Sequence, residues 1–325
     1  MTHSAIFDIK TDAQFELEAL KAFKYQFEHN PIYRSFCDLL YKHPSEIIHS
    51  KDIPFLPIQF FKSHEVITEQ QSPEITFSSS GTTGSITSKH HIADLSLYEK
   101  SFRDAFAKAY NNPKDLVILA LLPSYLERSG SSLIYMIDDL IKTSNHPDSG
   151  FYLNDYEALS QKINALEKKG QKTLLIGVSF ALLDLVEKYT FNLHHTIVME
   201  TGGMKGRRKE LIREELHHIL CKGFGVQNIH SEYGMTELLS QAYSKGNGIF
   251  TTPPWMKIYT RDTEDALTIH HNSKSGGINI IDLANRNSCP FIATQDLGRV
   301  YNDGSFSILG RFDNSDIRGC NLLAL

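Results

Sequence analysis

The sequence has few of the features that mark membrane, secreted or nucleic-acid-binding proteins. Its longest apolar runs, such as residues 116–122, are too short to cross a bilayer. Residues 1–5 carry neither a basic flank nor an apolar segment, so we expect no export signal. A net charge of −5 without a long basic block disfavours binding to nucleic acid. We therefore expect a cytoplasmic globular protein with no membrane span and no nucleic-acid partner.

Cysteine is scarce as well. The four cysteines, Cys37, Cys221, Cys289 and Cys320, are scattered along the chain and none belongs to a Cys-x-x-Cys pair. A disulfide framework or a zinc knuckle is therefore not expected, and free thiols are the default. The histidines include no pair at the i, i+4 spacing of a zinc site. Histidine or cysteine metal sites are thus disfavoured.

The order of apolar and amphipathic segments predicts an α/β fold. The unbroken apolar run at 116–122 is typical of a parallel strand that is covered on both faces. Further strands are expected at 173–178, 196–199 and 226–230. Helical periodicity places helices before and between them, at about 97–110, 155–169, 180–189 and 208–220. From about residue 250 short strands and turns prevail, which predicts a smaller β-rich subdomain packed on a mostly parallel sheet.

Residues 78–84, Ser-Ser-Ser-Gly-Thr-Thr-Gly, are rich in hydroxyl groups and glycine. Glycine lets backbone N–H groups approach a phosphate closely, and consecutive N–H groups form an anion-binding nest. The run lacks the Gly-Lys-Ser/Thr ending of a Walker loop and the Gly-x-Gly-x-x-Gly of a dinucleotide fold. Taken alone, it is more often a solvated surface loop. Its interpretation as a phosphate-binding loop depends on the motifs that follow.

An acidic motif, Ser-Glu-Tyr-Gly-Met-Thr-Glu at 231–237, follows the strand expected to end at His230. Ligands of open α/β sheets bind at such strand ends. Glu237 could hold Mg²⁺, because this ion prefers hard oxygen ligands and bridges phosphates. Thr236 could donate to an α-phosphate, and Tyr233 could stack on a purine. A plain turn into a helix is the alternative interpretation.

Two further polar residues follow expected strands. Asp296, in Asp-Leu-Gly-Arg, could accept hydrogen bonds from both hydroxyls of a ribose. Arg311, in Gly-Arg-Phe-Asp, offers a planar donor fork suited to a ribose or a phosphate. The alternatives are a β-turn around Asp296 and a surface ion pair for Arg311.

Together, in this order and at these spacings, the four segments resemble the adenylate-forming superfamily. This superfamily includes acyl-CoA ligases, peptide-synthetase adenylation domains and firefly luciferase. The resemblance covers residue 75 to the C-terminus and implies the fold of the superfamily's large N-terminal domain. It also implies ATP and Mg²⁺ as cofactors, and a first half-reaction in which a carboxylate and MgATP give an acyl-adenylate and pyrophosphate.

The resemblance implies a role for each matching residue. Thr236 and Glu237 would act at the α-phosphate, and Glu237 would also hold the metal. Asp296 would bind the ribose, Arg311 the ribose or a phosphate, and Tyr233 the adenine. The other nucleotide-binding residues would come from the loop and from a glycine pair, namely Ser79, Ser80, Gly81, Thr82, Thr83, Gly84, Gly202 and Gly203.

The end of the sequence narrows the resemblance. Most superfamily members continue past Gly-Arg-x-Asp into a mobile domain with a catalytic lysine, and we expect that domain to be absent because the sequence ends at Leu325. The lysine that usually follows the loop directly is not in place, and the next lysine in the sequence is Lys89.

Cys320 lies in Arg-Gly-Cys-Asn-Leu-Leu, where Arg318 would lower the pKa of its thiol. This ending resembles the acyl-protein synthetase (LuxE-type) family of bacterial luminescence, in which a cysteine near the terminus accepts the acyl group. A similarity to phenylacetate-CoA ligases accompanies it.

The sequence therefore predicts a ligase that adenylates a carboxylic acid, of the fatty-acid class, and forms a thioester on Cys320. A partner such as an acyl reductase or an acyl carrier protein would then receive the acyl group. Two alternatives stay open, an acyl-CoA or acyl-carrier ligase in which Cys320 is incidental, and a non-catalytic binding protein. The expected parts are a helical region at 1–74, an ATP-binding α/β core at 75–249, a β-rich subdomain at 250–316 and an arm at 317–325.

Overall fold

The computed structural model describes most of the chain, namely residues 5–69, 71–79, 86–122, 130–153, 155–202, 211–270 and 273–312. The chain divides into two compact units. Met1–Ser72 and Pro254–Leu325 form one, which we call the split unit, and Pro73–Pro253 form the other, which we call the central unit. The predicted four-part division stays a prediction.

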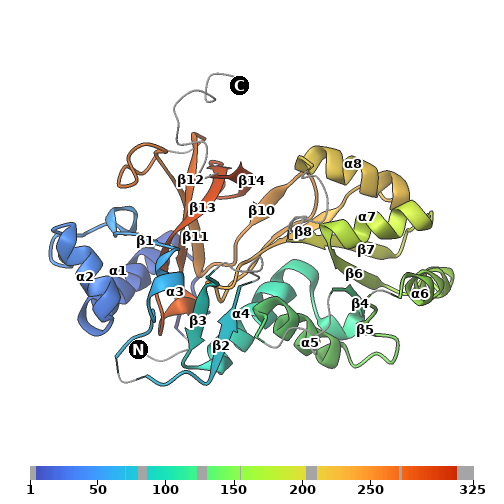
Figure 1. Ribbon diagram of the computed structural model, residues 1–325, viewed down its shortest axis with the longest axis horizontal. Coiled ribbons are helices and arrows are strands. Elements are labelled where there is room, and N and C mark those ends of the chain that lie inside the picture. The colour runs from blue at the N-terminus through green and yellow to red at the C-terminus, as the bar shows by residue number, and fades with distance from the viewer. Residues whose placement is uncertain are drawn as a thin grey trace. The chain divides into compact units, whose positions relative to one another are not determined.

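A mostly parallel sheet forms the centre of the central unit (Figure 1). Its strand order is β5-β4-β6-β7-β8-β9-β10, and the first five of these strands run parallel. The strands are β4 (Val117–Leu121), β5 (Gly150–Phe151), β6 (Thr173–Val178), β7 (Thr196–Thr201), β8 (His230–Tyr233), β9 (Ala242–Ser244) and β10 (Ile249–Thr251). Every residue of β4 and β6 is buried, as expected for parallel strands covered on both faces.

Helices cover both faces of this sheet. In Figure 1, α7 and α8 lie on one face and α4 and α5 on the other. The helices of the unit are α4 (Leu95–Tyr110), α5 (Ser132–Ser144), α6 (Tyr156–Lys168), α7 (Ser179–Lys188), α8 (Arg213–Phe224) and the short 3₁₀ helix η2 (Pro113–Asp115). This arrangement confirms the predicted α/β class with a large, mostly parallel sheet.

A separate hairpin brackets the hydroxyl-rich loop. Strands β2 (Ile75–Ser78) and β3 (Lys89–Ile92) pair antiparallel and form a two-stranded sheet of their own. Phe77 on β2 is buried, and its ring meets Tyr98 of α4 and Tyr135 of α5 edge-on at 5.3 and 5.7 Å between centroids. The hairpin is therefore anchored on the helices that cover one face of the main sheet.

The split unit joins the N-terminal helices to the C-terminal strands. Phe23 of α1 and Tyr33 of α2 meet Phe291 of β13 at 6.2 and 5.7 Å between ring centroids. Asn30 caps α2 and donates a hydrogen bond to the Ser288 carbonyl at 2.8 Å. Its helices are α1 (Asp12–His29), α2 (Pro31–Leu39), α3 (Phe60–Ser63), η1 (Ser50–Asp52) and η3 (Leu283–Asn285). Its strands are β1 (Leu56–Pro57), β11 (Met256–Arg261), β12 (Ser275–Asp282), β13 (Phe291–Val300) and β14 (Phe306–Arg311), with β11 to β14 an antiparallel meander.

Most expected elements are present with ends shifted by one or two residues, and the two largest differences concern β8 and α8. The strand expected at 226–230 is wrong, because β8 begins at His230 and ends at Tyr233. Helix α8 begins at Arg213 rather than at residue 208 and continues beyond residue 220 to Phe224. Its C-cap is Gly225, whose φ of +68° is the left-handed conformation that glycine favours. Strand β8 carries Ser231 and Glu232 rather than an apolar run, so hydrophobicity alone did not predict it.

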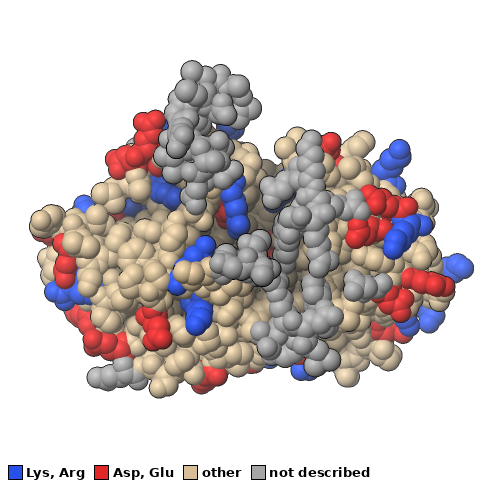
Figure 2. Space-filling view, in the orientation of Figure 1, with Lys and Arg blue, Asp and Glu red and all other residues tan. Residues whose placement is uncertain are grey.

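The surface agrees with the modest net charge of the sequence. On the face shown in Figure 2, acidic and basic side chains are interspersed among uncharged residues. Among the described residues, no helix combines the length and the apolar composition needed to cross a membrane.

Candidate active site

The carboxyl ends of three neighbouring strands form one edge of the central sheet. Val178 of β6 pairs with Thr201 of β7, and Thr201 pairs with Glu232 of β8. Gly202 leaves β7 with a φ of +66°, and its carbonyl accepts a hydrogen bond from Ser179 Oγ at 2.8 Å. Because ligands of open α/β sheets bind at such carboxyl ends, this edge is the candidate site of the unit.

The predicted acidic motif lies at this edge. Tyr233 is the last residue of β8, so the motif begins inside the strand rather than after it. Its ring is buried and meets Phe250 of β10 edge-on at 5.8 Å between centroids. Thr236 is half-buried and Glu237 buried in the turn that follows. The structure thus places Gly202, Tyr233, Thr236 and Glu237 at or just after the carboxyl ends of the paired strands β7 and β8.

A buried carboxyl group beneath this turn was not predicted. Glu232 lies in register with Thr201 and with Tyr243 of β9, so the three side chains share one face of the sheet. Thr201 Oγ1 donates to Glu232 Oε2 at 2.5 Å. Burial raises the pKa of Glu232 to about 7. The charge of Glu200 adds to this rise, and the hydrogen bond from Thr201 opposes it. A Cβ atom on Gly234 would lie 2.4 Å from Glu232 Oε1, so the carboxyl group packs directly against the turn.

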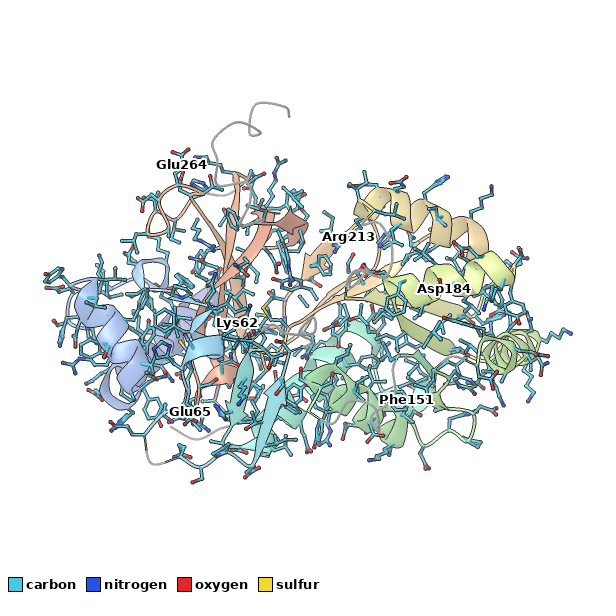
Figure 3. All side chains as sticks on the ribbon, in the orientation of Figure 1. Lys62, Glu65, Phe151, Asp184, Arg213 and Glu264 are labelled. Atoms are coloured by element: carbon cyan, nitrogen blue, oxygen red, sulfur yellow. The ribbon has the colours of Figure 1, made fainter. Side chains whose placement is uncertain are left out.

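The opposite face of the same strand ends carries a second buried carboxylate. Glu200 accepts from Ser179 Oγ at 3.3 Å and lies 3.5 Å from His217 Nε2 and 3.8 Å from Arg213 Nε. Figure 3 shows Arg213 at the beginning of α8, and its guanidinium lies over the Phe250 ring at 4.9 Å. The end of β7 is thereby tied to α7 and α8.

The raised pKa of Glu232 predicts a pH-dependent stability. An unfolded glutamate loses its proton near pH 4.3, whereas folded Glu232 keeps it to about pH 7. Glu232 therefore contributes fully to the free energy of unfolding below its unfolded pKa. This contribution is lost as the pH rises through its folded pKa. The full change is about 4 kcal/mol at 1.36 kcal/mol per pKa unit.

Urea unfolding at about pH 5 and about pH 8 measures this contribution. The uncharged variant Glu232→Gln should lose less stability across this range than the wild-type chain. Equal pH dependence of the two proteins would contradict the assignment.

The neck of the hydroxyl-rich loop is closed by two hydrogen bonds. Ser79 N–H donates to the Ser88 carbonyl at 3.0 Å, and Ser88 N–H donates to Ser79 Oγ at 2.9 Å. Lys89, the late lysine of the sequence, is exposed on β3. The next residue, His90, is fully buried, and its Nδ1 lies 2.8 Å from the Thr236 carbonyl oxygen. This contact joins the hairpin that brackets the loop to the acidic motif.

In the split unit, the structure pairs the two residues predicted to contact the ribose. Asp296 and Arg311 are cross-strand neighbours on β13 and β14, and Arg311 Nε donates to Asp296 Oδ1 at 2.9 Å. Asp296 is buried, whereas the Arg311 side chain is 76% exposed. The ion pair that was an alternative for Arg311 therefore exists, and it holds the two side chains on one face.

Sequence reasoning missed a second arginine near Asp296. Arg261 is buried and donates to the carbonyls of Ile278 and Thr294 at 2.8 and 2.6 Å. Desolvation lowers its pKa to about 10, and the charge of Asp296 opposes this shift. A Cβ atom on Gly277 would lie 2.6 Å from Arg261 Cζ. The Gly-Gly pair at 276–277 was the signal in the sequence, since it leaves room for this side chain.

The remaining predicted residues lie outside the described part of the chain. These are Ser80, Gly81, Thr82, Thr83, Gly84, Gly203 and Cys320. The nucleotide-binding and catalytic roles of all the site residues stay predictions.

The described cysteines are poor candidates for a nucleophile. Cys37, Cys221 and Cys289 are free thiols. Burial raises the pKa of each, that of Cys37 to about 12. Because the thiolate is the reactive form, a raised pKa disfavours acyl transfer to these three positions.

Comparison with known proteins gives a relative that is similar over most of the chain. No family model matches. The long-chain-fatty-acid–luciferin-component ligase of Vibrio harveyi is 23% identical over an alignment that covers 93% of this chain and 84% of that protein.

Solved structures share the fold. A 2-hydroxyisobutyryl-CoA ligase in the postadenylation state, in complex with R3-HIB-AMP, matches with a TM-score of 0.68 at 12% identity over 93% of this chain and 68% of its own. ATP-bound MatB from Rhodopseudomonas palustris matches with a TM-score of 0.55 at 15% identity. That match covers 73% of this chain and 47% of the MatB chain, so the chain spans about half the length of MatB. At these identities the likeness concerns the fold.

Proposed function

We propose that this chain is an ATP-dependent ligase. The proposal rests on its resemblance to adenylate-forming ligases of the long-chain-fatty-acid type, which these comparisons bear out. Its substrate would be a fatty acid, which it converts to acyl-AMP. The acyl group then passes to Cys320 and from there to a partner protein, an acyl reductase or an acyl carrier protein. We place the reaction in the cytoplasm.

In the first step, an oxygen of the fatty-acid carboxylate bonds to the α-phosphorus of ATP. The bond from that phosphorus to the bridging oxygen breaks, and its electron pair leaves with pyrophosphate. Thr236 would donate a hydrogen bond to the α-phosphate, and Ser79 and the following loop residues would hold the β- and γ-phosphates. The chain's contribution is positioning and charge stabilisation, which dominate in such transfers.

Glu237 suits a magnesium ion. It is a hard oxygen donor, buried in the turn after a strand end, and such a carboxylate together with substrate phosphates is the usual protein setting of Mg²⁺. When bound there, the ion would neutralise part of the phosphate charge. Tyr233 and Gly202 would border the adenine, while Asp296 and Arg311 would bind the ribose or a phosphate.

In the second step, the Cys320 thiolate bonds to the acyl carbon. The bond from that carbon to the phosphate oxygen breaks, and its electron pair leaves with AMP. Arg318, two residues away, would favour the thiolate form. The raised thiol pKa values of the three described cysteines support the choice of Cys320.

The observation that carries the proposal is the contact between two segments far apart in the sequence. The acidic motif at the end of β8 and the hairpin that brackets the hydroxyl-rich loop meet at His90 and Thr236. A nucleoside triphosphate needs two such neighbouring segments, because its α-phosphate and its leaving pyrophosphate must be held at the same time.

Mass spectrometry of the chain after incubation with MgATP and an isotope-labelled long-chain fatty acid tests the proposal. We expect the acyl mass on the peptide that contains Cys320. An unlabelled chain that instead makes acyl-CoA when coenzyme A is added would contradict transfer to Cys320 and favour the acyl-CoA ligase.

A further inference from the structure

The Nδ1 atom of His90 is the hydrogen-bond donor in its contact with Thr236. A carbonyl oxygen can only accept, so Nδ1 carries the proton in the 2.8 Å contact. Burial lowers the pKa of His90 to about 4, although the same hydrogen bond opposes the shift. The ring is therefore neutral at physiological pH, and Nδ1–H is a fixed donor.

Both partners of this hydrogen bond belong to well-anchored segments. His90 lies two residues beyond Ser88, which closes the neck of the loop, and pairs in register with Phe77. On the other side, Ser240 Oγ lies 2.9 Å from Ser101 Oγ of α4, which ties down the chain beyond Thr236. The hydrogen bond of His90 thus spans two supported segments rather than two flexible ones.

We propose that His90 is a positioning residue that fixes the distance between the phosphate-binding loop and the turn of Thr236 and Glu237. The inference rests on the proposed function, in which these segments hold the pyrophosphate and the α-phosphate of one ATP molecule. A shift of one segment against the other misplaces the α-phosphorus relative to its leaving group. A misplacement of about 1 Å can cost about 10²-fold in rate.

Substitutions at His90 separate the donor from the bulk of the ring. His90→Asn keeps an N–H donor near the position of Nδ1, whereas His90→Gln places its amide near Nε2 and His90→Leu has no donor. His91→Leu is the matched control, because His91 is the next residue of β3 and contacts Thr76 Oγ1 at 2.9 Å instead of the turn.

Fatty-acid-dependent exchange of labelled pyrophosphate into ATP is the activity readout. We expect H90L and H90Q to lower kcat by about 10- to 10²-fold with little change in KM for the fatty acid. H90N should recover most of the activity, and H91L should match the wild type. A folded H90L protein at the wild-type rate, or equal activity of H90N and H90Q, would overturn the inference.

Amide hydrogen exchange at residues 234–241 provides a second readout that needs no turnover. These amides should exchange faster in H90L than in the wild type and in H90N. Unchanged protection in H90L would overturn the positioning role, and if H90L does not fold, H90Q takes its place. A wild-type chain that shows no pyrophosphate exchange would instead contradict the proposed function, with the hydrogen-exchange comparison still testing His90.

Discussion

Replacing Cys320 by serine is expected to abolish the acyl–protein adduct while leaving fatty-acid-dependent pyrophosphate exchange at the wild-type rate. The thiolate is the nucleophile of the second step, and a serine hydroxyl without an adjacent base is a weak one. Exchange reports only the first step, which precedes transfer to the thiol. Two assays on one variant thus separate activation from transfer.

Cys221→Ser is the control for this experiment. Cys221 is partly exposed, and burial raises its thiol pKa, so its loss should leave both the adduct and the exchange unchanged. An adduct that persists in C320S would contradict the assignment of the acceptor. Loss of exchange in C320S would show that Cys320 also serves the activation step.

Replacing Glu237 by glutamine is expected to slow pyrophosphate exchange by about 10²–10³-fold, the usual cost of removing one electrostatic contact to a transition state. The substitution keeps the size of the side chain but removes the charged oxygen that suits Mg²⁺. The Mg²⁺ concentration needed for half-maximal exchange should rise as well, which a loss of stability alone would not cause.

Glu214→Gln provides the comparison, because Glu214 is an exposed glutamate in the first turn of α8. Thermal unfolding of both variants shows whether the fold survives. An E237Q protein with the wild-type rate and the wild-type Mg²⁺ requirement would exclude Glu237 from the site.

Much of the central sheet could be predicted from the sequence. Strands β4 and β6 are buried on both faces, so each appears as an unbroken apolar run. Strand β8 could not be predicted in this way, because it contains the polar residues Ser231 and Glu232. These side chains are buried all the same, and tertiary contacts satisfy their polar groups. The β2–β3 hairpin is short, and the Lys-His-His-Ile sequence of β3 gives no hydrophobic signal.

The sequence motifs predicted the polar residues of the candidate site but not the tertiary contacts that support them. Tyr233, Thr236 and Glu237 were named from the motif, and they lie at the end of a strand, although that strand extends to Tyr233 instead of ending at His230. The supporting contacts join residues far apart in the chain, such as His90 with Thr236 and Thr201 with Glu232. Only the tertiary fold sets such pairs, so no local pattern indicates them.

Exchange of labelled pyrophosphate into ATP by the wild-type chain, measured with and without a long-chain fatty acid, tests most directly the claim that this protein activates acids as acyl-adenylates. We predict exchange that requires both Mg²⁺ and the fatty acid. A pure, folded chain that shows no exchange with any carboxylic acid would contradict the claim and favour a binding protein with an adenylating fold.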